Sequence, residues 1–190
     1  MIYFFRMDEL KSFKIKEERE IVKSDDGKLS WIENDLITPS GEKVTWSRAR
    51  ASNDVVVIVP LAEDNEVYLK REWRLSSGDF VWEFPSGYME KGEEIFETAQ
   101  REVQEEIGFK AGKLEKLATF ALAERFSATY HLVLASNLTP SKLESSDKHE
   151  HLQVGKFSIE EARKKTNAGE GGKVYALLAL SYLEKPFKGR

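Results

Sequence analysis

The chain has 190 residues, 41% apolar and 33% charged, which is enough length and apolar content for a real core. Its 29 basic and 33 acidic residues leave a net charge of -4, which argues against a nucleic-acid binder. The absence of cysteine excludes disulfides and thiolate metal sites and fits a cytoplasmic location. No apolar run approaches the roughly 20 residues that span a bilayer, so we expect no membrane partner.

Residues 1–50 are polar and rich in turns. Gly-containing turns at 23–28 and 38–43 separate runs with strand character at 19–23, 29–35 and 43–49. This pattern predicts a small β-meander. Because it has little apolar content of its own, we expect it to pack on the rest of the chain or on a second subunit.

Residues 51–190 alternate strands with helices, which predicts a layered α/β domain. The β-branched run at 53–61 is typical of a buried central strand. Further strands are expected at 66–73, 80–85, 116–122, 130–136 and 152–158. An acidic helix is expected between Gly92 and Gly108, and two more helices at 158–166, with a Ser158/Glu161 capping box, and at 174–184.

The acidic helix has a narrow apolar stripe that predicts its buried face. Gly92 is suited to its start and Gly108 to a left-handed stop. At about 100° per residue, one face collects four apolar side chains: Phe96, Ala99, Val103 and Ile107.

Three acids, Glu102, Glu105 and Glu106, occupy the arc beside that stripe and repel one another. Arg101 is the only cation nearby on the helix, and no lysine lies one turn away. A solvated helix face is one interpretation. The other is a divalent metal site, since all-oxygen ligands select hard ions such as Mg²⁺ or Mn²⁺.

The spacing of these residues resembles the Nudix box, Gly-x5-Glu-x7-Arg-Glu-U-x-Glu-Glu-x-Gly-U, where U is apolar. The preceding segment, at 69–87, is similar to the branch that cleaves ADP-ribose and other nucleoside diphosphate sugars. The resemblance implies a Nudix-type α/β/α sandwich with a mixed sheet over 51–190, preceded by the meander. The defined positions are matched by Gly87, Glu93, Arg101, Glu102, Val103, Glu105, Glu106, Gly108 and Phe109.

The resemblance also implies a reaction: metal-dependent hydrolysis of the diphosphate linkage, which yields a nucleoside monophosphate and a sugar phosphate. Glu102, Glu105 and Glu106 would hold Mg²⁺ or Mn²⁺ together with the backbone carbonyl of Ser86, and Arg101 would orient the carboxylates. Glu93 would be structural. A general base is expected on the loop before the strand at 152–158, and the candidates there are Glu150, with Glu144 and Asp147 as rivals. A solvated polar loop is the alternative.

Four residues are candidate substrate contacts: Arg74, Trp46, Arg50 and Glu83. The forked donors of Arg74 suit a diphosphate, although a surface salt bridge explains it equally well. Trp46, like Trp31, could stack on a nucleobase or simply pack. In related enzymes the meander is exchanged between subunits, so the resemblance implies a homodimer with exchanged N-terminal strands.

The segment beyond the box bears on the substrate specificity. Members of this branch that cleave ADP-ribose usually carry a proline about sixteen residues beyond the box, where this chain has Glu124 and Arg125. A broader preference, including ADP-ribose and GDP-mannose, is therefore expected. The alternatives are a Nudix enzyme acting on nucleoside triphosphates or RNA 5′ ends, and a non-catalytic nucleotide-sensing domain.

Overall fold

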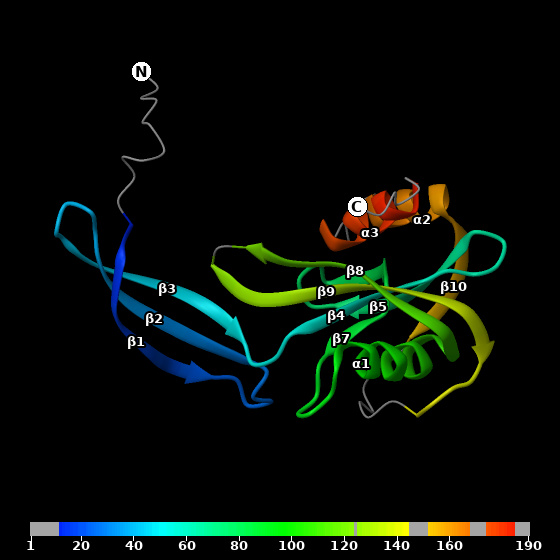
Figure 1. Ribbon diagram of the computed structural model, residues 1–190, viewed down its shortest axis with the longest axis horizontal. Coiled ribbons are helices and arrows are strands. Elements are labelled where there is room, and N and C mark those ends of the chain that lie inside the picture. The colour runs from blue at the N-terminus through cyan, green and yellow to red at the C-terminus, as the bar shows by residue number, and fades with distance from the viewer. Residues whose placement is uncertain (1–11, 124, 145–151, 168–173, 185–190) are drawn as a thin grey trace, which may run out of the picture. The chain divides into compact units, whose positions relative to one another are not determined.

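The computed structural model describes residues 12–123, 125–144, 152–167 and 174–184 (Figure 1). Its contacts divide the chain into two compact units. The first unit contains the residues up to Ser52 together with Leu122–Ala128, and the second contains Asn53–Ala121 and the residues from Thr129 onward. Residues 122–128 therefore join the N-terminal unit although they lie far along the chain.

The first unit is the expected β-meander. Three antiparallel strands pair in the order β1, β2, β3, and the first residues of β9 pair in parallel with the end of β3. Alternate side chains of β2, including Ile32 and Leu36, are buried, which is the period-2 pattern of a strand with one covered face. The strands are β1 (Lys14–Lys23), β2 (Leu29–Ile37) and β3 (Lys43–Ala51).

The second unit is built around β4, whose six residues are all buried. This strand pairs in parallel with β9 and antiparallel with β7, and β8 pairs with β9, so the sheet is mixed as predicted. A second, antiparallel sheet has the order β10, β5, β6. The bounds are β4 (Val55–Pro60), β5 (Glu66–Arg74), β6 (Asp79–Glu83), β7 (Ser86–Tyr88), β8 (Phe109–Ala123), β9 (Phe126–Pro140) and β10 (Gln153–Ser158).

Helices cover both sides of the second unit. Figure 1 shows α1 on one side of the strands and α2 and α3 on the other. Ala99 and Val103 of the α1 segment pack against Val56 and Ile58 of β4 in one buried cluster. The predicted α/β/α layering is therefore confirmed. The helices are α1 (Ile95–Glu102), a π-helical turn η2 (Val103–Ile107), α2 (Ile159–Asn167) and α3 (Val174–Glu184).

The acidic helix departs from the prediction at its start. Its N-cap is Glu94 rather than Gly92, because Glu94 and Glu97 form a reciprocal capping box with the first turn. Phe96, predicted to be buried, is 45% exposed, and the apolar residue of the first turn that packs against the core is its neighbour Ile95. Gly108 ends the helix with φ 78°, so the predicted left-handed stop is confirmed.

Other differences concern the strands. The segments expected at 116–122 and 130–136 are the second half of β8 and the middle of β9, two 15-residue strands that continue into polar residues beyond the apolar runs. The three-residue β7 was not predicted, since three residues carry no periodicity. The Ser158/Glu161 capping box is confirmed, with a 3.3 Å hydrogen bond from the Glu161 N–H to the Ser158 hydroxyl. Within the described residues, no helix has the length and apolarity to cross a membrane.

Candidate metal and active site

The three acids lie where α1 changes into the π-helical turn. Glu102 is 7% exposed and Glu106 is 2% exposed. The wider π turn begins between them, and such turns are frequent at functional sites. Burial raises the pKa of Glu102, and it raises the pKa of Glu106 to about 8, against the opposing charge of Lys70. The two carboxylates are thus held in the protein rather than in solvent, which makes the solvated helix face a poor description of them.

Glu106 is held by groups from two strands. The Ser86 N–H of β7 donates to its Oε2 atom at 2.9 Å, and the Lys70 ammonium of β5 donates to its Oε1 atom. Ser86 contacts the site through its N–H, and the role of its carbonyl as a metal ligand stays a prediction. Lys70 lies 36 residues before Glu106 in the chain and is itself 1% exposed.

Arg101 connects three acidic residues of the box to one another. Its Nε donates to Glu93 at 2.8 Å, and its terminal nitrogen donates to Glu102 at 2.6 Å and to Glu105 at 3.4 Å. A further bond runs to the backbone carbonyl of Tyr88 at 3.2 Å. This geometry agrees with a guanidinium that orients carboxylates, and that role of Arg101 stays a prediction.

Gly87 lets the backbone of β7 approach Glu102 closely. A Cβ atom added to Gly87 would lie 1.8 Å from the Glu102 Oε1 atom and 2.2 Å from its carboxyl carbon. A side chain at this position would fit only if the Glu102 carboxylate moved. The box glycine is therefore required because the strand backbone and a buried carboxylate occupy neighbouring positions.

The donor set fits a hard divalent ion. Three carboxylates within two turns supply oxygen ligands only, which is the chemistry that Mg²⁺ and Mn²⁺ prefer. Among the residues that the structure describes, no three acidic or histidine side chains already form a metal cage. The reason is visible in the contacts, since Lys70 is bound to Glu106 and Arg101 to Glu102 and Glu105. A bound ion would have to share these carboxylates with the two cations.

Arg74 and Glu83 lie beside this cluster and contact each other. The Arg74 Nε donates to Glu83 Oε1 at 2.9 Å, and its terminal nitrogen lies 2.9 Å from Glu72 Oε2. Glu83 is fully buried, whereas the Arg74 side chain is 30% exposed. Both residues therefore border the candidate metal ligands, and their contact with substrate stays a prediction.

The remaining candidates belong to other segments of the chain. Trp46 and Arg50 belong to β3 in the first unit, where Trp46 packs on Phe13 at 4.9 Å between ring centroids and Arg50 pairs with Glu18 at 2.6 Å. Glu144 follows β9 and belongs to no helix or strand. The other two candidate bases, Asp147 and Glu150, lie outside the described residues.

Sequence reasoning missed Lys70. The statement that Arg101 is the only nearby cation holds along the helix but is wrong in three dimensions, because β5 brings Lys70 onto Glu106. A signal was present in the strand itself: Lys70, Glu72 and Arg74 alternate on one face of β5, and such a charged face on a buried strand indicates ionic partners. It could not have identified which partners.

With the geometry described, comparison with known proteins decides the family. A model of the NUDIX domain matches residues 52–178, two thirds of the chain, and this match contains the box. The chain belongs to the Nudix family. A relative, the ADP compounds hydrolase NudE of Escherichia coli K12, is 32% identical over 122 residues, 63% of this chain and 65% of that protein. The match thus spans slightly less than two thirds of that relative.

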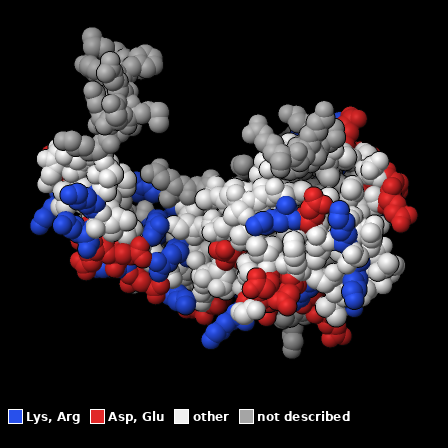
Figure 2. Space-filling view, in the orientation of Figure 1, with Lys and Arg blue, Asp and Glu red and all other residues white. Residues whose placement is uncertain are grey.

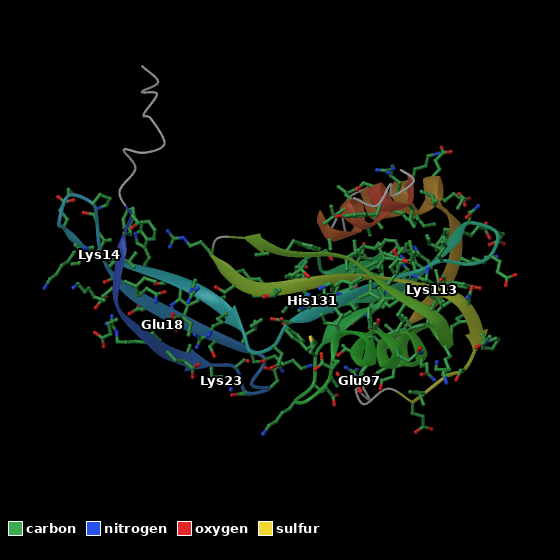
Figure 3. The ribbon with its side chains drawn as sticks, in the orientation of Figure 1. Lys14, Glu18, Lys23, Glu97, Lys113 and His131 are labelled. Atoms are coloured by element: carbon green, nitrogen blue, oxygen red, sulfur yellow. The ribbon has the colours of Figure 1, made fainter. Side chains whose placement is uncertain are left out.

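Two further comparisons agree with the predicted branch of the Nudix family. The ADP-ribose pyrophosphatase of Bacillus subtilis 168 is 30% identical over 133 residues, 68% of this chain and 71% of that protein. A crystal structure of an ADP compounds hydrolase superposes with a TM-score of 0.80 at 25% identity and covers 92% of this chain and 93% of that one. The predicted Nudix fold and the ADP-ribose branch are confirmed. Acidic side chains gather over α1 of this Nudix domain (Figure 2), where Figure 3 labels Glu97.

Proposed function

We propose that this Nudix protein hydrolyses the diphosphate linkage of nucleoside diphosphate sugars, ADP-ribose among them, to a nucleoside monophosphate and a sugar phosphate. The observation that carries the proposal is the buried pair of Glu102 and Glu106 between β7 and the helix, with Glu105 beside them. The names of the relatives, an ADP compounds hydrolase and an ADP-ribose pyrophosphatase, favour an ADP-containing substrate. GDP-mannose stays a candidate because of the Glu124–Arg125 departure.

Glu102, Glu105 and Glu106 would hold a divalent ion, and Mg²⁺ is the ion we propose, with Mn²⁺ as a substitute. When bound, such an ion neutralises phosphate oxygens and lowers the pKa of a water molecule. The chain's own residues then have distinct tasks. Arg101 keeps the carboxylates of Glu102 and Glu105 turned toward one another, and the Ser86 N–H fixes one oxygen of Glu106.

Arg74 would bind the diphosphate with its forked donors, at the border of the acidic cluster. Glu150 would take the proton of the attacking water, and Glu144 and Asp147 are its rivals for this role. The negative charge of the buried acids makes a second anion unfavourable there without cations, so substrate and metal should bind together.

The test is direct. The purified protein is incubated with Mg²⁺ and ADP-ribose, ADP-glucose, GDP-mannose, ATP and a 5′-triphosphate RNA, and the products are identified by mass. We expect AMP or GMP from the sugars and little product from the last two. The Glu106→Gln variant should fold normally and lose turnover, because a metal ligand is removed without changing the side-chain volume. Release of inorganic diphosphate from ATP as the main reaction would instead support a triphosphate hydrolase.

We also propose a homodimer with exchanged N-terminal strands in the cytoplasm. Within the described residues, β1 pairs with β2 on one side only, so its other edge can take a further strand. Apolar side chains of this strand are exposed, Ile15 to 68% and Val22 to 60%. Light scattering after size-exclusion chromatography should give twice the 21.8 kDa chain mass, and a monomer would refute the dimer.

A further inference from the structure

Lys70 is buried among three carboxylates. Its side chain is 1% exposed, and its ammonium contacts Glu106, lies 3.0 Å from Glu72 and lies 3.8 Å from Glu83. Two of these acids, Glu106 and Glu83, are themselves almost inaccessible to solvent. A charged lysine in such a place is stable only with partners, and the acids are stable only with a cation.

The charges of this cluster depend on one another. The ammonium of Lys70 contacts Glu106 and lies near Glu72 and Glu83, and these carboxylates offset the cost of burying its charge. Without Lys70, three acids would face one another with Arg74 as the neighbouring cation of Glu72 and Glu83. Glu106 would then lose the ammonium that contacts it.

We propose that Lys70 is the resident counter-ion of the metal-free site and competes with the divalent ion for Glu106. The proposal rests on the proposed function, in which Glu106 is a metal ligand. When a metal ion binds the Glu106 carboxylate, Lys70 keeps two partners, Glu72 and Glu83. Lys70 therefore does not have to leave its buried position. Lys70 is thus a positioning residue that keeps the acids in place between metal-binding events.

Competition between Lys70 and the metal ion predicts the direction in which metal affinity and stability change when Lys70 is replaced. A cation that contacts a metal ligand weakens metal binding, so its removal should strengthen binding while destabilising the metal-free protein. In Lys70→Met we expect the melting temperature after chelator treatment to fall by about 4 °C or more. The rise in melting temperature on adding Mg²⁺ should be larger than in the parent protein. The Mn²⁺ dissociation constant, measured by electron paramagnetic resonance, should fall about tenfold.

A matched control is Lys113→Met. Lys113 lies on β8 (Figure 3), is 63% exposed and pairs with Glu115 at 3.0 Å, so its replacement also removes one lysine from an ion pair. It should change neither the melting temperature nor the Mn²⁺ affinity measurably. An effect of equal size in this control would show that net charge alone is responsible, which would overturn the proposal.

A second variant tests the opposite sign and does not depend on the folding of the first. Glu72→Gln removes one of the acids that draw Lys70 away from Glu106, so Mn²⁺ should bind severalfold more weakly. Weaker or unchanged Mn²⁺ binding in Lys70→Met, or unchanged binding in Glu72→Gln, overturns the proposal. Neither measurement needs turnover. A parent protein that binds Mn²⁺ but cleaves no nucleotide sugar would refute only the proposed function.

Discussion

Gly87 and Glu102 occupy the same small volume from two sides: an added Cβ atom on the glycine would lie 1.8 Å from the glutamate oxygen. The contact joins β7 to the last residue of α1. It explains in steric terms why the first position of the box is a glycine, although 14 residues of the chain lie between Gly87 and Glu102.

Replacing Gly87 by Ala should therefore displace the Glu102 carboxylate. We expect Mn²⁺ affinity to fall at least tenfold, which corresponds to about 1.4 kcal/mol, together with the rate of ADP-ribose hydrolysis. Titration calorimetry and a rate assay measure both. Gly41→Ala is the control, because nothing lies within 4 Å of its added Cβ although its φ of +94° makes it strained. Stability loss in both variants with metal binding lost only in Gly87→Ala supports the prediction, and full metal affinity in Gly87→Ala contradicts it.

Arg74 and Arg71 offer a matched pair for the diphosphate contact. Arg74 faces Glu72 and Glu83, whereas Arg71 points to the other face of β5 and lies over the Phe80 ring at 5.7 Å. Arg74→Met should raise KM for ADP-ribose about tenfold or more, because a hydrogen bond between charged groups contributes about 1.5–3 kcal/mol. Arg71→Met should leave KM unchanged. If Arg74→Met lowers only the melting temperature, the arginine is a structural ion-pair partner.

The ionisation of Glu93 should contribute to the pH dependence of the unfolding free energy. Hydrogen bonds from Arg101, helped by Thr98 and the Glu90 N–H, lower the pKa of Glu93 to about 2. A lowered pKa stabilises the folded state above the ordinary value near 4.5, and this contribution disappears as the pH falls toward 2. Glu93→Gln should thus lower the unfolding free energy by about 1.5–3 kcal/mol at pH 7 and by little at pH 2.5.

Urea unfolding at both pH values measures this difference. Glu160→Gln serves as the control, since Glu160 forms only an exposed pair with Lys164 at 2.7 Å and should change stability little at either pH. If Glu93→Gln lowers the unfolding free energy by the same amount at pH 7 and at pH 2.5, the ionisation of Glu93 is not responsible.

We propose that the general base is one of three acids in the sequence between β9 and β10. Separate alanine variants of Glu144, Asp147 and Glu150 should single out Glu150, whose loss we expect to lower kcat by about 100-fold, within the usual range for general bases. Mn²⁺ affinity should be unchanged in all three, because none is a proposed ligand. Equal kcat in all three would place the base among the helix carboxylates instead.

Much of this protein follows from its sequence because the relevant signals are local. The buried run at 55–60, the Ser158 capping box and the Gly108 stop depend on residues within a few positions of one another, and the box lies within one continuous segment, 87–109. Periodicity and capping act over such distances, so they predicted the layered fold and the position of the acidic helix. The family was predicted by the resemblance of the box spacing to the Nudix box.

Tertiary structure alone decided how the acids are neutralised. Lys70 reaches Glu106 across 36 residues, and Gly87 approaches Glu102 from another strand, and neither contact has a local signature in the chain. The exposure of Phe96 and the π turn at Val103–Ile107 were likewise apparent only in the structure. Residue spacing placed the acids on one helix. Their partners were determined only by the packing of β5 and β7 against that helix, because electrostatic and steric contacts form between whichever side chains the fold brings together.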